Sequence, residues 1–341
     1  MANNLGIPQN ILDQFEREMN VKISSITDLQ TGMSNRLYKL VSQRQSYLLK
    51  MYANDDESRL KREYPALSYL PTVGFDEVPK GIMVDYENGW AIYTFLEGGK
   101  KTAQEMNHND LVAIANYVNR LQKITASQVD VEILPAHMAC FAIQDYLNNM
   151  DLRLSQYKKT VENGKASNIL KQFDNEYQPQ KVVKKSIDNI LRNMDESKIK
   201  QEIEIKDRRL SPVDLGPHNM LFDNEKVNFL DFERFGWDDP RRLVAEFLNH
   251  DQTVGISDEN KEFFREYYKK SWNMPEPLRK DFDLIVDLFE VDWLTIIIFS
   301  VTDKKIKTRK FSNPNFVLDE YLLKQTDKMA KRIDKLNSRY G

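Results

Sequence analysis

Two kinds of hydrophobic pattern divide the chain near residue 100. In the first part, short runs rich in β-branched and aromatic residues predict strands over 22–30, 36–41, 47–52, 81–86 and 90–96. A polar turn at 43–46 and the Asn88-Gly89 pair predict that neighbouring runs form antiparallel hairpins. Residues 57–70 have a helical pattern, in which Pro65 predicts a kink or a boundary.

After residue 103 the apolar residues recur at helical spacing. This pattern predicts helices over 103–124, 138–161, 179–205, 240–250, 257–272, 278–301 and 315–338. Two short strands around a polar turn interrupt it at 220–230. We therefore expect an α+β chain with a small antiparallel β lobe (1–96), a short hinge (97–102) and a larger, mostly helical lobe (103–341).

Composition restricts the classes of protein to consider. The 341 residues are 41% hydrophobic and 30% charged, a globular mixture, and the net charge of −3 argues against nucleic acid as a partner. The single cysteine, Cys140, excludes an intrachain disulfide and favours a reducing compartment. The first residues lack a secretory pattern, and the longest apolar stretch, 293–301, is too short to span a membrane. We expect a cytoplasmic protein.

The segment 211–233 carries the clearest candidate chemistry. Asp214 precedes Asn219 by five positions, and the hairpin that follows leads to Asp231, so three oxygen-bearing side chains are expected at one end of the hairpin. One carboxylate can orient a hydroxyl group, while an amide oxygen and a second carboxylate can bind Mg²⁺. This layout is typical of phosphoryl transfer. The competing interpretation is a solvated loop aspartate and a turn-capping asparagine.

The order of these features resembles the aminoglycoside phosphotransferase and choline kinase superfamily, small-molecule kinases with a two-lobed, protein-kinase-like fold. The resemblance implies that ATP is bound, that Asp214 is the catalytic base, and that Asn219 and Asp231 are Mg²⁺ ligands. The family pattern H-G-D-x-x-x-x-N has a histidine where this chain has Pro212. We expect this change to affect the rigidity of the loop more than its chemistry.

The resemblance also implies a nucleotide site in the first lobe. Lys50, in a strand, would bind the α- and β-phosphates and be held by Glu63, with Glu57 as the alternative. The turn 31–36 contains Gly32 and Ser34, which would let backbone amides approach phosphate. By position alone, Leu96 and Glu97 would offer backbone groups to adenine.

Several other residues have more than one interpretation. Glu233 is either an extra ligand or a supporting group, and His218 is expected to be an ordinary loop histidine. Glu246 is expected to be structural. Asp283, Asp287 and Glu290 would share one helical face close to Trp293, where they could receive a cationic acceptor, although a solvated face is the favoured interpretation.

These inferences predict an ATP- and Mg²⁺-dependent phosphotransferase that acts on a hydroxyl of a small molecule. The expected partners are a nucleotide and that molecule. A pseudokinase-like nucleotide-binding module and a nucleotidyl transferase acting on a protein are the alternatives. The acceptor stays open among aminoglycosides, choline or ethanolamine, thiamine, homoserine and sugars, as do the choice of ATP or GTP and the oligomeric state.

Overall fold

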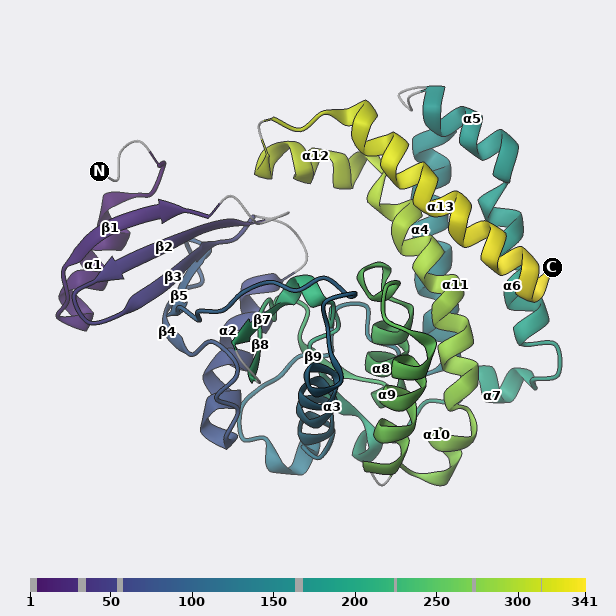
Figure 1. Cartoon of the computed structure of the whole chain (residues 1–341), viewed down its shortest axis with the longest axis horizontal. Coiled ribbons are helices and arrows are strands. Elements are labelled where there is room, and N and C mark those ends of the chain that lie inside the picture. Colours follow the sequence, from purple (N-terminus) through teal and green to yellow (C-terminus); the bar gives the residue numbers. More distant parts are fainter. Residues whose placement is uncertain are drawn as a thin grey trace.

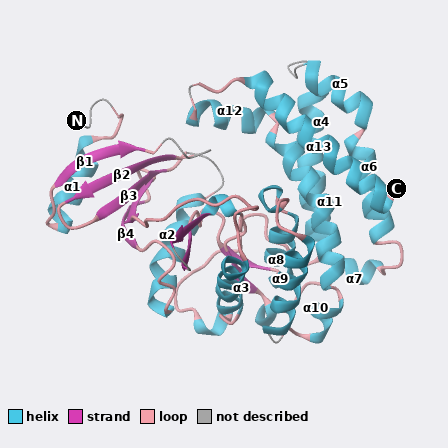
Figure 2. Ribbon diagram, in the orientation of Figure 1, coloured by secondary structure: helices cyan, strands magenta, loops and turns pink. Residues whose placement is uncertain are grey.

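The computed structural model describes residues 5–29, 35–53, 58–162, 168–223, 226–271, 274–313 and 315–341. An antiparallel sheet lies at one end of the molecule and a mostly helical body at the other (Figures 1 and 2). This arrangement confirms the predicted order of a β-rich part followed by a helical part. The residue boundaries of the lobes and hinge remain a prediction.

The N-terminal sheet has five strands in the order β1-β2-β3-β5-β4. Its elements, with two flanking helices, are α1 (Gln9–Met19), β1 (Ile23–Asp28), β2 (Arg36–Ser42), β3 (Ser46–Met51), α2 (Arg59–Tyr69), β4 (Gly81–Asp85) and β5 (Trp90–Thr94). On β3, Leu49 is fully buried in the cluster shared with Phe15 of α1. Because successive side chains of a strand point to opposite faces, Lys50 points away from α1.

Helix α2 runs through Pro65 and continues to Tyr69, so of the two predicted effects of this proline, a kink or a boundary, the boundary is wrong. Proline removes one backbone donor from the helix interior, which normally weakens it. Here the helix buries Leu60, Ala66 and Leu67, and this packing holds it together.

The segment after β5 pairs with the hairpin that carries the candidate site. The backbone N–H of Gly99 donates to the Phe222 carbonyl at 2.9 Å, and the Phe222 N–H donates back at 2.8 Å. Gly98 has a φ of +146°, and a Cβ there would lie 2.9 Å from the Leu221 Cβ. Only glycine fits this conformation and this close approach without strain.

The C-terminal body consists of helices and two small two-stranded sheets. Its helices are α3 (His108–Gln122), α4 (Ile143–Glu162), α5 (Asn168–Tyr177), α6 (Pro179–Ile190), α7 (Glu196–Lys200), α8 (Pro240–Asn249), α9 (Asp258–Ser271), α10 (Glu276–Lys280), α11 (Phe282–Ser300), α12 (Asp303–Ser312) and α13 (Leu318–Tyr340). Its strands pair as β6 (Arg209–Ser211) with β9 (Gly236–Asp238) and β7 (Met220–Asp223) with β8 (Lys226–Phe229).

Helix α11 organises the C-terminal core. It packs against α4, α6, α8 and α13, and most of its apolar side chains are buried. The β7–β8 hairpin is anchored separately, since the Phe229 ring stacks on Tyr117 of α3 with centroids 3.7 Å apart. The packing of α11 and the stacking of Phe229 on Tyr117 together fix the helical body that supports the site.

Among the described residues, no helix is both long and apolar enough to cross a bilayer.

The helix predictions differ from the structure in a few places. The single helix predicted over 179–205 is wrong, because α6 ends at Ile190 and a separate short helix, α7, follows Asp195. Helices α1, α5 and α12 were not predicted. The helix predicted over 240–250 is confirmed as α8, which Asp239 caps by accepting the Arg241 N–H at 2.9 Å.

A Gly98→Ala substitution should lower the free energy of unfolding by roughly 2–4 kcal/mol, because it combines backbone strain with a clash. Gly74 is a matched control, since its φ is +87° but a Cβ there would meet nothing within 4 Å. Gly74→Ala should cost only about 1 kcal/mol. Urea denaturation of both variants measures the difference, and equal losses would contradict the close packing of Gly98 on the hairpin.

Candidate active site

Lys50 is the centre of a buried charge cluster between the sheet and the helical body. Its Nζ lies 2.7 Å from Glu63 Oε2 of α2 and 2.9 Å from Asp231 Oδ1, which follows β8. Glu233 Oε2 is 3.6 Å away. Burial alone would lower the pKa of Lys50, but the negative charges of Asp231, Glu63 and Glu233 more than offset it and hold that pKa well above its ordinary value.

Glu63 is fixed by further contacts, so its orientation does not depend on Lys50 alone. The Tyr52 hydroxyl donates to Glu63 Oε2 at 2.6 Å, and the Phe232 N–H donates to Oε1 at 3.2 Å. The structure therefore brings Lys50 and Glu63 together as the sequence predicts. The alternative partner, Glu57, lies outside the described residues.

Glu233 supports the cluster from the helical side. It accepts hydrogen bonds from Arg59 at 2.7 Å and from Asn35 at 2.6 Å. Burial, followed by the nearby Asp231 carboxylate, raises its pKa to about 7. Oxygens of Glu63, Asp231 and Glu233 all lie within 4.8 Å of one another. Three carboxylates thus face two cations, Lys50 and Arg59, and this negative excess suits an added cation.

Asn219 and Asp231 flank the open end of the β7–β8 hairpin. The Leu230 N–H donates to the Asn219 carbonyl at 2.8 Å, next to the Met220–Phe229 pair of the hairpin. The Asn219 Nδ2 donates to the Asp214 carbonyl at 3.0 Å, which identifies Oδ1 as the atom available to a cation. Asp231 has a φ of +63° and a side chain that is 38% exposed. It is the most accessible member of the carboxylate cluster.

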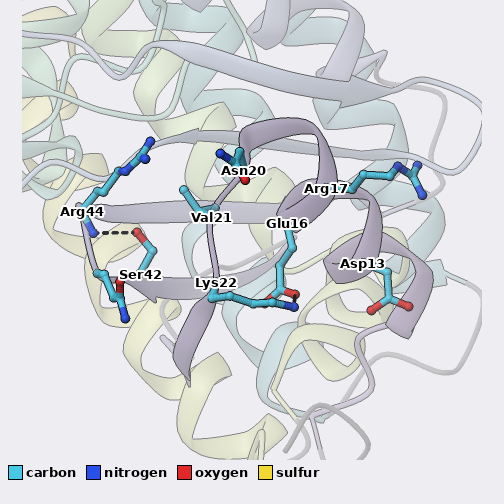
Figure 3. A pocket seen from close by; sticks show the side chains of 9 residues that line it. Asp13, Glu16, Arg17, Asn20, Val21, Lys22, Ser42 and Arg44 are labelled. Atoms are coloured by element: carbon cyan, nitrogen blue, oxygen red, sulfur yellow. Dashed lines mark hydrogen bonds and ion pairs between the residues drawn. The ribbon is translucent and has the colours of Figure 1, made fainter.

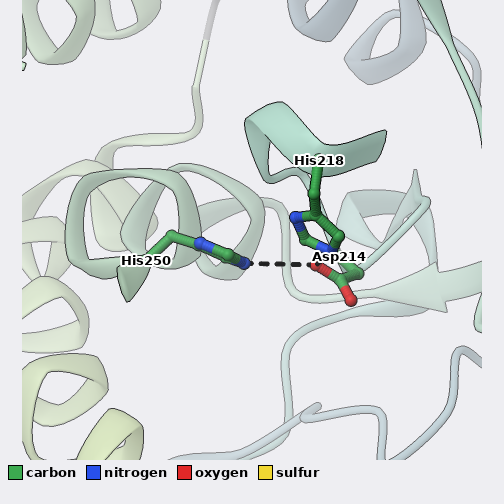
Figure 4. Close-up of side chains that lie close together, drawn as sticks. All are labelled: Asp214, His218 and His250. Carbon is green, nitrogen blue, oxygen red and sulfur yellow. Dashed lines mark hydrogen bonds and ion pairs between the residues drawn. The ribbon is translucent and has the colours of Figure 1, made fainter. Parts of the chain in front are cut away.

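Asp214 lies at the other end of the same loop, beside two histidines (Figure 4). His250 Nε2 and His218 Nε2 lie 3.3 Å and 3.4 Å from Asp214 Oδ1. Burial would raise the pKa of Asp214, but hydrogen bonds from both imidazoles hold it well below its ordinary value. His218 was expected to be an ordinary loop histidine, and that expectation missed this contact.

Lys100 is a residue that the sequence did not single out. Its Nζ donates to the carbonyls of His218 at 2.6 Å and Met220 at 3.0 Å, which are the two neighbours of Asn219. Burial lowers the pKa of Lys100, while the Asp231 carboxylate acts in the opposite direction. The segment after β5 therefore holds the loop around Asn219 by a charged donor as well as by backbone pairing.

The remaining nucleotide-site predictions are only partly placed. Gly32 and Ser34 lie outside the described residues, although Asn35 directly after them is anchored on Glu233. Leu96 is half-buried, and the Glu97 carbonyl accepts Asn228 Nδ2 at 3.4 Å. The Glu97 side chain pairs with Lys39 at 2.9 Å. No contact here identifies an adenine site.

The acidic face predicted on α11 is already neutralised. Asp283 pairs with Arg265, and Asp287 and Glu290 both pair with Arg339 of α13. These ion pairs favour structural roles for the three carboxylates over reception of a cationic acceptor.

Glu246 of α8 is buried, and burial raises its pKa well above the ordinary value.

A surface pocket of about 470 Å³ lies away from these residues, beside α1 and the turn between β2 and β3 (Figure 3). Its lining includes Asp13, Arg17 and Arg44, and its Glu16 and Lys22 pair with each other at 2.7 Å. It contains none of the candidate residues. The site is therefore assigned from the polar clusters around Lys50 and Asp214.

Comparison with solved structures shows a shared fold. A spectinomycin phosphotransferase in complex with ADP and spectinomycin has a TM-score of 0.66 at 13% identity, over 97% of this chain and 99% of that one. A choline kinase from Streptococcus pneumoniae has a TM-score of 0.58 at 14% identity, over 96% and 98%. An aminoglycoside phosphotransferase solved with streptomycin and ATP has a TM-score of 0.60 at 15% identity, over 96% and 97%.

These likenesses confirm the two-lobed kinase fold that the sequence predicts. A comparison with curated proteins finds no match. The model of the family described as "Phosphotransferase enzyme family" matches residues 25–278, about three quarters of the chain. The chain therefore belongs to the phosphotransferase enzyme family.

Proposed function

We propose that this protein transfers the γ-phosphate of ATP to a hydroxyl group of a small molecule in a Mg²⁺-dependent reaction. The observation that carries this proposal is the contact of Lys50 with both Glu63 and Asp231. In this proposal, Lys50 of the sheet binds phosphate and Asp231, at the end of the hairpin, binds the metal ion. Membership of the phosphotransferase family and the kinases among its structural neighbours support the same reaction class.

The donor groups fit Mg²⁺. The cluster offers hard oxygen ligands, carries more carboxylates than cations, and exposes Asp231 to solvent. Asn219 Oδ1 and Asp231 would hold the ion. When bound, Mg²⁺ neutralises charge on the β- and γ-phosphates. Lys50, oriented by Glu63, would bind the α- and β-phosphates, with the turn 31–36 over them and the segment 96–97 beside adenine.

Asp214 would act on the acceptor. A carboxylate with a lowered pKa is a weak base, and it remains charged at neutral pH. Phosphoryl transfer asks for little proton abstraction before the loose transition state, so the main contribution of Asp214 is to orient the hydroxyl in line with the γ-phosphate. Because the acidic side chains of α11 are paired, we propose a small hydroxyl compound without assigning it a positive charge.

Asp231→Asn should weaken binding of Mg²⁺·ATP about tenfold or more, because it removes a charged ligand and a partner of Lys50. Asp223→Asn is the matched control at the closed end of the same hairpin and should bind normally. Isothermal titration calorimetry measures both variants. Equal affinities for wild type and Asp231→Asn would remove Asp231 from the nucleotide site.

Asp214→Asn should lower turnover by about 10²–10⁴-fold and leave the affinity for Mg²⁺·ATP nearly unchanged, because Asp214 acts on the acceptor. A screen of hydroxyl metabolites with mass detection of the product measures the activity. The expected product carries one added phosphate. A product that carries AMP, or an Asp214→Asn variant with normal turnover, would contradict the proposal.

Lys100→Gln should raise the Mg²⁺ concentration required for half-maximal ATP binding by about three- to tenfold, because the carbonyls on both sides of Asn219 lose a charged donor. The adjacent Lys101 pairs with Asp110 at 2.8 Å instead. Lys101→Gln should therefore lower the melting temperature and leave the Mg²⁺ dependence unchanged. A Lys100→Gln variant that behaves like Lys101→Gln would show that Lys100 has only a structural role.

A further inference from the structure

We infer that His250 and His218 are positioning residues for the reaction, which hold Asp214 Oδ1 so that Oδ2 alone receives the acceptor hydroxyl. This inference rests on the proposed function. It is prompted by the sequence of the loop that carries Asp214, in which Pro212 stands where the family pattern has a histidine. His218 follows Asp214 by four residues in the same loop, whereas His250 comes from the end of α8, and both converge on the carboxylate (Figure 4).

The hydrogen bonds of His250 fix which ring nitrogen carries the proton. The backbone N–H of Gln252 donates to His250 Nδ1 at 3.0 Å, so Nδ1 carries no proton. The proton is therefore on Nε2, which donates to Asp214 Oδ1 at 3.3 Å. His250 is only 4% exposed, and its ring packs edge-on against Trp293, with centroids 4.5 Å apart. His250 is thus a donor to Asp214 that is held in one orientation.

His218 reaches the same oxygen with the same tautomer. Its Nε2 is 3.4 Å from Asp214 Oδ1, while its Nδ1 is buried and bonds to no described residue. A proton on Nδ1 would be a buried, unpaired donor, which is costly, so the proton belongs on Nε2. Gly216 makes room for both rings, because a Cβ there would lie 2.5 Å from His218 Nδ1 and 2.7 Å from His250 Cε1.

Two donors on Oδ1 leave Oδ2 without a bond to any described residue. Since Oδ1 is held at two points, rotation of the carboxylate is restricted and Oδ2 keeps one direction. In the reaction the acceptor oxygen bonds to the γ-phosphorus, the bond from that phosphorus to ADP breaks, and the hydroxyl proton moves to Oδ2. The histidines already carry a proton on the nitrogen facing Asp214, so they orient this carboxylate and do not take up the proton.

Two substitutions separate this role from a structural one. The amide nitrogen of glutamine lies close to the place of a histidine Nε2, so His250→Gln keeps the donor to Asp214 and loses the acceptor for Gln252. Asparagine has the shorter reach of Nδ1, so His250→Asn keeps the acceptor for Gln252 and loses the donor to Asp214. We expect His250→Asn to lower the rate of Mg²⁺·ATP hydrolysis, with water as acceptor, about 10- to 100-fold, and His250→Gln to lower it less than about threefold.

Binding of Mg²⁺·ATP, measured on the same full-length proteins, is expected to be equal in both variants and shows that they are folded. Equal hydrolysis rates in wild type and His250→Asn, with normal binding, would overturn the inference and leave the proposed function intact. Absence of Mg²⁺·ATP binding in the wild type would overturn the proposed function and this inference with it. If water proves too poor an acceptor to give a rate, ¹⁵N NMR of the histidine rings decides: Nε2–H on His250 supports the inference, and Nδ1–H overturns it.

Discussion

A lysine ammonium group buried among three carboxylates is the interaction on which the rest of the structure depends. Lys50 is 5% exposed, and a charge so far from water is tolerated only when it is paired. Its partners are Glu63 of α2 and two carboxylates that follow β8, Asp231 and Glu233. One charge therefore ties the N-terminal sheet to the hairpin, and this tie brings the proposed phosphate-binding cation and the proposed metal-binding oxygens into one site.

The loop between Asp214 and Asn219 is held from two further directions. His250, at the end of α8, contacts Asp214, and Lys100, after β5, contacts the carbonyls on both sides of Asn219. Gly99 pairs with Phe222 on the same hairpin. Such supports matter because phosphoryl transfer depends on placing the reacting groups and the surrounding charges accurately. They also show how the chain keeps an ordered loop with Pro212 at the position of the family histidine.

The sequence predicted what local patterns and spacing can encode. Alternating and helical periodicities indicated the five strands of the sheet and most helices, and the predicted start at residue 240 matches the start of α8. The Lys50–Glu63 pair was implied by the family resemblance, and the structure places the two side chains in contact. The split of 179–205 into α6 and α7 was missed, because no glycine or proline marks the break between Ile190 and Asp195.

Contacts between residues that are far apart in the sequence leave no local pattern from which they could be predicted. His250 is 36 positions from Asp214, and Lys100 is 118 positions from His218, so no local spacing relates them. A buried histidine at a helix end and a lysine after a strand also have many ordinary explanations. The ion pairs of Asp283, Asp287 and Glu290 could not be foreseen for the same reason, since their partners lie on α9 and α13.

The central claim is that the Lys50 cluster and Asn219 together hold a metal ion against the phosphates of a nucleotide. A crystal structure of the protein with Mn²⁺ and a non-hydrolysable ATP analogue, with anomalous data at the manganese edge, tests it most directly. The account predicts an anomalous peak bonded to Asn219 Oδ1 and Asp231, with Lys50 on the α- and β-phosphates. A nucleotide bound elsewhere, or a peak that touches neither Asn219 nor Asp231, would contradict it.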